Sequence, residues 1–281
     1  MTNTVDQRAR AAASGLSFGG ILRSEWIKLR TLRSTVWCYA IIIVVTIGFG
    51  LLVAATMADN GQTTRASQQS AWLQATTLGI SFSQLVVAVL GALVITGEYG
   101  TGMIRSTLTA VPRRVPALAA KAIVFGVVTF VVSALSLIVT ALVTAPLLSS
   151  KGIAPDLGDV DFWLALLGGA GYLALLGVLS LAIGTIIRNS AGGIAASLGL
   201  ILVVPLIVQI LAAITRADWA QNIGAFLPSA AGGRMYSYAP SAVGGPEGVV
   251  SLEPWQGLIV LAVWFLVMFV IGAVLLKRRD A

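Results

Sequence analysis

The chain has 281 residues, of which 57% are hydrophobic and only 10% are charged, and its formal net charge is +7. Ordinary water-soluble domains contain about 25% charged residues, so this composition excludes a soluble globular protein. Long charge-free runs also exclude a transmembrane β-barrel, because barrel strands show short segments of alternating polarity. We therefore expect an all-α integral membrane protein.

The first predicted element is an amphipathic helix from about Gly19 to Arg33. Its apolar face contains Leu22, Trp26 and Leu29. A basic helix of this kind lies in the plane of the membrane interface. Glu25 falls inside the apolar arc, where it is best placed beside a cation such as Lys28, three residues further on. A generic membrane anchor explains this segment about as well as a specific role does.

Six apolar runs are each long enough to cross the roughly 30 Å of hydrocarbon in a bilayer. The predicted membrane helices are Val36 to Met57, Thr76 to Thr96, Leu118 to Leu147, Phe162 to Ile187, Ala191 to Ile214 and Trp255 to Leu276. The predicted outer loops are Ala58 to Ala75, Ser149 to Asp161 and Thr215 to Pro254. No loop is long enough for a folded catalytic domain.

The loop after the second predicted span, from Gly97 to Ala117, is the most informative connection. Thr101 can cap a short helix that runs to about Leu108. Such a helix on the inner face suits contact with a soluble partner. An ordinary basic loop explains the arginines of this segment, but it does not explain Glu98 at the membrane edge.

Two glutamines, Gln84 and Gln209, are the larger polar groups inside the predicted spans. An amide that faces lipid is costly, so each side chain should face protein or a cavity. Hydrogen bonds that serve packing are the favoured interpretation for both.

Several kinds of chemistry are excluded by residues that the sequence lacks. The chain contains no histidine, which excludes His-based triads, proton relays and zinc ligation. It contains no Gly-Lys dipeptide and therefore no phosphate-binding loop. The predicted spans contain no Asp or Glu, and their one cation, Lys121, can reach the interface by snorkelling. We expect no catalytic, cofactor-binding or metal-binding residues on this chain.

The basic residues predict the orientation. With six spans both termini lie on one side, and 14 of the 18 Lys and Arg residues fall on that side. Because an excess of Lys and Arg marks cytoplasmic segments, we expect both termini to be cytoplasmic. The basic residues flank membrane helices and form no stripe with interleaved aromatics, which argues against nucleic-acid binding.

Two segments carry a family resemblance: LRSEWIKLRTLRS before the first span and GEYGTGMIRSTLTAVPRRVPALAAK after the second. Together they resemble the permease subunits of ABC-2 type ATP-binding-cassette exporters, of the small actinobacterial type. The resemblance implies an elbow helix before the first span and a coupling helix at about Thr101 to Leu108 that docks on an ATPase. The implied coupling residues are Glu98, Thr101, Met103, Ile104, Arg105 and Leu108. In that family Gln84 and Gln209 would lie near the pathway.

The resemblance also implies partners and a location. Residues 1–34 would form a tail and elbow helix, and residues 35–281 would form one transmembrane domain in the bacterial plasma membrane. The chain would work with two copies of a separate ATPase, which would hold ATP and magnesium, and with a second permease copy or a paralogous permease among membrane lipids. The alternatives are a non-transporting sensor or assembly protein that binds a cytoplasmic partner, and a secondary transporter or channel. The transported substrate cannot be inferred from the sequence.

Overall fold

The computed structural model describes residues 17–57, 64–103, 114–238 and 248–278. These ranges contain helices and no strand, and six helical segments are long and apolar enough to cross a membrane. The six segments are α3 (Arg33–Thr56), α4 with α5 (Arg65–Thr77 and Ile80–Gly100), α7 (Arg114–Ser149), α8 (Val160–Ile187), the stretch Ser190–Thr215, and α13 (Pro254–Arg278). The predicted all-α membrane fold with six spans is therefore confirmed.

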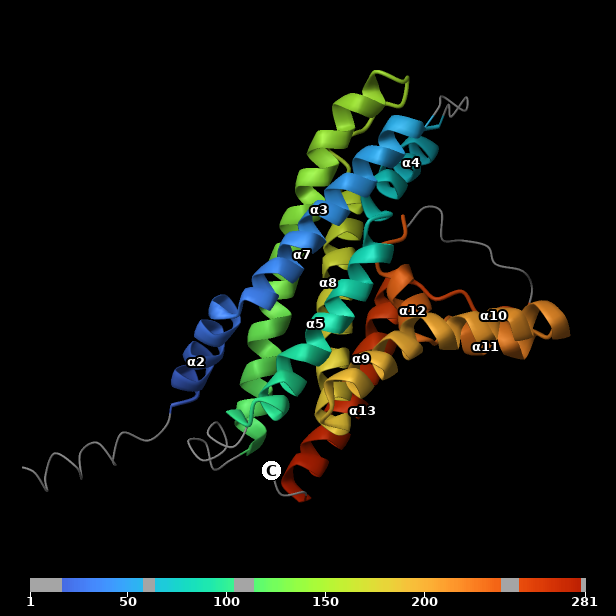
Figure 1. The fold of residues 1–281 in the computed structure, drawn as a ribbon. Coiled ribbons are helices and arrows are strands. Elements are labelled where there is room, and N and C mark those ends of the chain that lie inside the picture. Colours follow the sequence, from blue (N-terminus) through green and yellow to red (C-terminus); the bar gives the residue numbers. More distant parts are fainter. Residues whose placement is uncertain (1–16, 58–63, 104–113, 239–247, 279–281) are drawn as a thin grey trace, which may run out of the picture.

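Helix α8 forms the centre of the bundle, where it packs against α5, α7 and α13 (Figure 1). Small residues allow the closest of these contacts. A Cβ on Gly91 of α5 would lie 2.3 Å from the Gly177 carbonyl oxygen of α8, and a Cβ on Gly177 would lie 2.9 Å from the Phe125 ring. Because neither glycine has a Cβ, the backbones of α5 and α8 can approach closely, as is common between membrane helices.

The second span is longer than predicted and is broken near its outer end. Residues 65–75, expected to be loop, belong to α4, which begins where the Thr64 side chain accepts a hydrogen bond from the backbone N–H of Ser67. The break before α5 lies at Gly79, where a Cβ would be 2.6 Å from the Thr46 Cα of α3. The prediction of a loop was wrong here, because α4 is polar along its sequence but packs its Trp72 side into the bundle.

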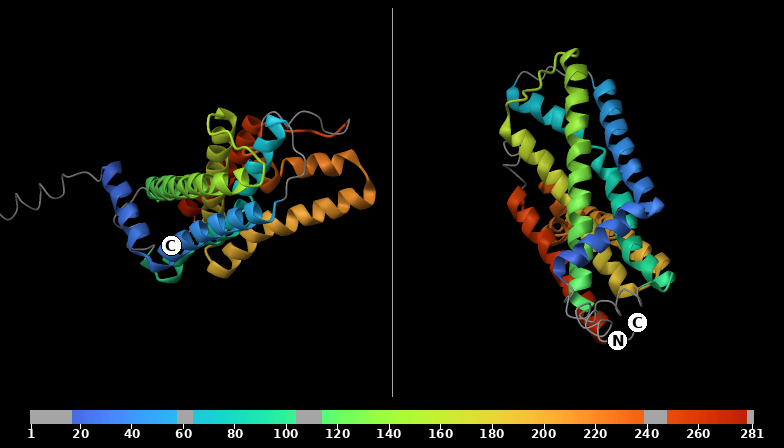
Figure 2. Two further views of the ribbon diagram at one scale, coloured as in Figure 1. Left: turned by 90° about the horizontal axis from the view of Figure 1, so that it is seen from above. Right: turned by 90° about the vertical axis from the view of Figure 1, so that its left-hand side faces the viewer.

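The fifth span changes its helical form halfway. It consists of α9 (Ser190–Leu198), a π-helical turn (Gly199–Val203) and α10 (Val204–Thr215), with Pro205 as the second residue of α10. Proline has no backbone N–H to donate, so a local change of hydrogen-bond pattern is expected next to it. Figures 1 and 2 show α10 leaning away from the other helices, and none of its residues is buried.

The predicted outer loop from Thr215 to Pro254 contains two helices among its described residues and folds back against the bundle. Helix α11 (Asp218–Ala225) pairs with α10, and α12 (Pro228–Arg234) packs against α13 and α8. At Gly232 of α12 a Cβ would lie 2.0 Å from the ring of Tyr172. Tyr172 follows the start of α8 by about 12 residues, or roughly 18 Å along the helix axis, so α12 reaches the middle of the bundle.

The helix ends that the sequence predicts to be cytoplasmic lie together at one end of the molecule, which we call the inner end after that prediction. Helix α2 (Phe18–Thr31) crosses α7 there, and Leu32 in an extended conformation turns the chain from α2 into α3 (Figure 2). A guanidinium nitrogen of Arg114, the first residue of α7, donates to the Leu276 carbonyl oxygen near the end of α13, at 2.8 Å. The two ends of the described chain therefore lie on the same side of the bundle.

Candidate functional site

Helix α2 carries an ion pair, Glu25 with Lys28, at the inner end of the bundle. It begins where the Ser17 side chain accepts a hydrogen bond from the Gly20 N–H, at 3.2 Å, and it buries only Ile21 and Glu25. The predicted helix, from about Gly19 to Arg33, is close to the observed one. The side that it buries carries Ile21 and Glu25, whereas Trp26 of the predicted apolar face is exposed. Glu25 lies beside Lys28 as predicted, with 2.7 Å between Oε1 and Nζ.

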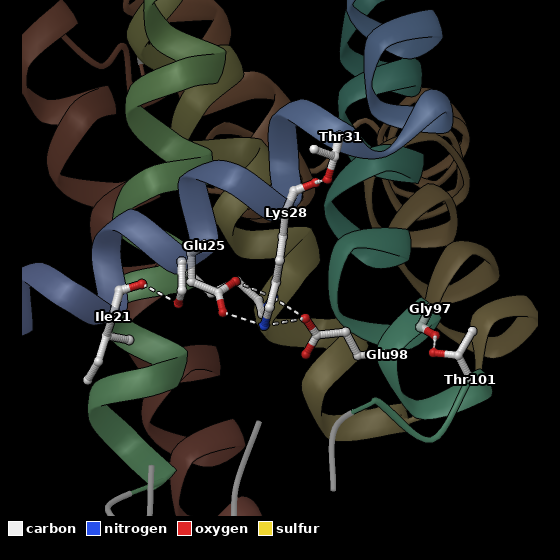
Figure 3. Close-up of polar contacts among 9 residues, drawn as sticks. Ile21, Glu25, Lys28, Thr31, Gly97, Glu98 and Thr101 are labelled. Carbon is white, nitrogen blue, oxygen red and sulfur yellow. Dashed lines mark hydrogen bonds and ion pairs between the residues drawn. The ribbon is translucent and has the colours of Figure 1, made fainter. Parts of the chain in front are cut away.

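Two residues from other helices, Glu98 and Lys121, complete a ring of four charges. Figure 3 labels three of its members, Glu25, Lys28 and Glu98. The Lys121 ammonium of α7 lies 2.6 Å from Glu25 Oε2 and 2.8 Å from Glu98 Oε1 of α5. The Lys28 ammonium lies 3.1 Å from that same Glu98 oxygen. Each lysine thus bridges both carboxylates, and the ring joins α2, α5 and α7.

Most of the ring is out of contact with solvent. Glu25, Glu98 and Lys121 are exposed by 3%, 4% and 5%, and Lys28 is partly exposed. Burial alone raises the pKa of Glu25, but the charges and hydrogen bonds of Lys121 and Lys28 outweigh it and hold that pKa below its usual value. Burial lowers the pKa of Lys28, but its contacts with Glu25 and Glu98 hold that pKa above its usual value. Both groups of α2 are therefore charged at neutral pH.

The position of Lys121 corrects one sequence interpretation. Its ammonium does not snorkel to the interface, because Glu25 and Glu98 bind it inside the bundle. Helix α5 also continues to Gly100, four residues beyond the predicted span, and so contains Glu98. One signal was available in the sequence: a cation inside the third predicted span, an acid in the apolar arc of the amphipathic helix, and an acid at the edge of the second span. Sequence separation hid which of them would meet.

The predicted coupling segment is described only at its start. The Thr101 hydroxyl donates to the Gly97 carbonyl oxygen at 2.9 Å and so helps to close the end of α5. Met103 is exposed. Ile104, Arg105 and Leu108 lie outside the described residues, and the docking role of this segment stays a prediction.

The two glutamines line one cavity of about 510 Å³ near the middle of the bundle. Gln84 of α5 accepts a hydrogen bond from the Tyr172 hydroxyl and donates to the Ser81 carbonyl oxygen at 3.0 Å. Gln209 of α10 is exposed and lies on the other wall, with α11 and α12 closing the space. Gln84 therefore serves helix packing and also faces a cavity, two interpretations that the sequence had treated as alternatives.

A further polar cluster, which sequence reasoning missed, centres on Asp159 and holds the chain after α12. Asp159 Oδ2, at the start of α8, accepts hydrogen bonds from the Tyr238 hydroxyl at 2.6 Å and from Gln69 Nε2 at 3.0 Å. Gln69 of α4 also binds the backbone of Asp156 in both directions. These contacts hold α4, the loop before α8 and the chain after α12 together at the outer end.

The described residues contain no group of three or more His, Cys, Asp or Glu side chains that could hold a metal ion. The two lysines and two glutamates of the ring balance in formal charge. Each carboxylate oxygen of the ring except Glu98 Oε2 contacts an ammonium group of the ring. The arrangement of the ring can join three helices at the inner end of the bundle.

Comparison with known proteins agrees with this architecture. None of the curated proteins matches the chain. The profile described as ABC-2 family transporter protein matches residues 20–281, which include all six spans and all of α2 except its first two residues. The resemblance to the ABC-2 family, inferred from the two sequence segments, is thereby confirmed. This chain is a multi-pass membrane protein that belongs to the ABC-2 transporter family.

Proposed function

We propose that this chain is the permease subunit of an ABC-2 type exporter, which forms the substrate pathway across the bacterial plasma membrane and is driven by a separate ATPase. The family match over residues 20–281 carries this proposal. The chain itself would be non-catalytic, and ATP and magnesium would bind to two copies of the ATPase subunit.

The ring offers a physical route from the ATPase to the membrane helices. The loop after α5 begins at Thr101, three residues beyond Glu98. A force applied to that loop would act on the end of α5, and the ion pairs of Glu98 would pass it to α2 and α7. Buried ion pairs suit this purpose because separating them leaves uncompensated charge in a medium of low dielectric constant.

The proposed pathway lies between two permeases. The π turn and α10 together expose a row of large apolar side chains. Leu202 and Val203 are in the π turn, and Leu206, Ile207, Ile210 and Ile214 are in α10. Lipid or a second permease copy could cover this row. The cavity lined by Gln84 and Gln209 lies behind it and offers amide groups among apolar side chains. This composition suits amphiphiles such as lipids, peptides or hydrophobic drugs better than small ions.

Purification of the tagged chain from native membranes in mild detergent tests the proposal. A soluble ATPase without membrane spans should copurify, and the complex should hydrolyse ATP while the isolated chain should not. Reconstitution of the complex into vesicles should then show ATP-dependent movement of an amphiphile. Hydrolysis by the isolated chain would exclude the assignment, and an ATPase complex that moves no compound would favour the sensor or assembly role.

A further inference from the structure

A cavity of about 280 Å³, smaller than the one lined by Gln84 and Gln209, lies between α4 and the chain around the end of α12. Helix α4 lies at the end of the bundle opposite to α2 (Figure 1). Side chains between Ser70 and Thr77 of α4 form one wall, and residues 233–238 form the other. Drug-sized ligands occupy about 300–1,000 Å³, so this cavity suits the head group of a larger molecule.

Arg234 is the charged side chain on this wall. It is partly buried, and within the described ranges it has no ion pair and its guanidinium donates no hydrogen bond. Other cations at this end do have partners, since Arg65 pairs with Asp156 and Lys151 donates to the Met57 carbonyl oxygen at 2.8 Å. A partly buried guanidinium with five N–H donors and no counter-ion points to a missing acceptor.

Two neutral side chains on the wall have hydrogen-bonding capacity to spare. Gln74 of α4 is exposed, and its amide makes no hydrogen bond with the described part of the chain. The same holds for the hydroxyl of Tyr236, which is partly buried. Both groups can donate, so the wall offers neutral donors in addition to the guanidinium.

The nearby acid Asp159 does not line the cavity. Its Oδ2 accepts from the hydroxyl of the lining residue Tyr238 at 2.6 Å and from Gln69 Nε2 at 3.0 Å, and its Oδ1 accepts from the Asp161 N–H at 3.0 Å. Its charge is thus stabilised by its own donors.

The charge of the wall decides the charge of its ligand. A cationic head group would meet Arg234 and find no carboxylate among the lining residues. An uncharged head group would leave the guanidinium without a counter-ion. An oxyanion supplies both the opposite charge and the acceptor oxygens, and a guanidinium can bind two such oxygens at once.

We propose that this cavity binds an oxyanion head group, a phosphate or a carboxylate, through Arg234, with Gln74 and Tyr236 as further donors. Two sources supply this chemistry: a phospholipid of the adjacent leaflet, and the acidic group of a compound carried by the protein. Tyr236 also lines the cavity of Gln84 and Gln209, so the two cavities adjoin at this side chain. The site stands on the geometry of this chain and does not require the proposed transport role.

The test uses the full chain, without any ATPase, in a maltoside detergent that has no phosphate or carboxylate group. The probe is dodecyl phosphate with a diazirine beside its head group, and the matched probe carries a trimethylammonium head on the same chain. Crosslinked peptides are mapped by mass spectrometry. Below saturation, we expect the phosphate probe to label residues 70–77 and 233–238 at least about tenfold more than the ammonium probe, which is the selectivity of one charge-assisted hydrogen bond.

Three variants locate the labelling. Arg234→Gln should remove the preference for phosphate, whereas Arg216→Gln, at an exposed arginine away from the cavity, should keep it. Gly233→Trp should fill the cavity and stop labelling by both probes, because nothing lies within 4 Å of a Cβ at Gly233. Equal labelling of the unmodified chain by both probes would overturn the proposal, and so would a preference that survives Arg234→Gln. If Arg234→Gln fails to fold, the two probes on the unmodified chain and on Gly233→Trp still decide.

Two further arms distinguish the sources. A phospholipid that copurifies with the unmodified chain and with Arg216→Gln, but not with Arg234→Gln, would identify a resident lipid. With the ATPase bound, a loss of labelling on addition of MgATP would identify a carried compound. Only this last arm rests on the proposed function, so its failure would appear there, while failure of the site would already appear in the chain without ATPase.

Discussion

Lys121 and Glu25 are 96 positions apart in the sequence, and their ammonium and carboxylate groups lie 2.6 Å apart in the structure. This contact joins the interfacial helix α2 to the third membrane span. The sequence suggested separate roles for the two residues: Lys121 as a snorkelling cation and Glu25 as an acid of an anchor helix. In the structure they share one role, which is to join α2 to α7. Both side chains are buried, and each would lose one of its two ion-pair partners without the other.

Loss of Lys121 should destabilise the protein strongly. Lys121→Met leaves two buried carboxylates with only Lys28 between them, and removal of one partner of a buried ion pair costs about 3–5 kcal/mol. Thermal or denaturant unfolding of the purified chain measures this change. Lys277→Met, the same replacement at an exposed position, is the control. The double variant Glu25→Gln with Lys121→Met should recover part of the lost stability. If Lys121→Met and Lys277→Met are equally stable, the ion pairs of the ring do not stabilise the protein.

The packing of α12 against α8 depends on a glycine, Gly232, at the contact with Tyr172. Gly232→Ala would place a methyl group against the Tyr172 ring and should cost about 1–3 kcal/mol, as overpacking does. The neighbouring change Gly233→Ala should be neutral or slightly stabilising, because nothing lies within 4 Å of its added Cβ. Melting temperatures of the two variants provide the measurement. If both variants melt alike, α12 does not dock on Tyr172.

The two glutamines should differ in their effect on stability. Gln84→Leu removes the acceptor of the buried Tyr172 hydroxyl and should cost about 1–3 kcal/mol, and Tyr172→Phe in the same chain should restore much of this loss. Gln209→Leu, at an exposed position, should leave stability unchanged. Both changes should alter substrate-stimulated hydrolysis by the complex with the ATPase. Unchanged hydrolysis with every amphiphile tested would place the pathway elsewhere.

The predicted coupling segment can be tested apart from anchoring. Replacement of Met103, Ile104 and Leu108 by serine should weaken copurification of the ATPase and abolish transport, because apolar contacts in the centre of an interface contribute most of its affinity. Expression and membrane insertion should stay near normal. Arg113→Gln, in the basic part of the same segment, is a milder control, since charges at the rim of an interface chiefly affect encounter rates. An intact, transporting complex in the triple variant would rule out this segment as the docking point.

The orientation predicted from Lys and Arg can be tested by cysteine labelling. In a background with Cys38 replaced, Ala66→Cys and Ser150→Cys should react with an impermeant reagent added to intact cells, because both positions are exposed at the outer end. Lys277→Cys, exposed at the inner end, should react only after the cells are opened. Labelling of Lys277→Cys in intact cells would reverse the predicted orientation.

The sequence by itself determined the number and approximate positions of the membrane spans. The reason is physical: each span must satisfy its own backbone hydrogen bonds in lipid, so a long apolar run has one available structure, the helix. The amphipathic pattern before Arg33 likewise predicted α2, and the short-range pair of Glu25 and Lys28 followed from helix periodicity. The two segments that carried the family resemblance were also local.

Tertiary structure decided everything that joins these helices. No local pattern indicates that Lys121 meets Glu25 and Glu98, that a glycine of α12 receives the Tyr172 ring, or that Gln84 and Gln209 line one cavity. Such contacts depend on which helices are neighbours and on their rotation. Because the helices of this bundle are apolar on nearly every side, hydrophobic periodicity determines neither the neighbours nor the rotation of each helix. The packing of small residues and the pairing of the few buried charges determine both.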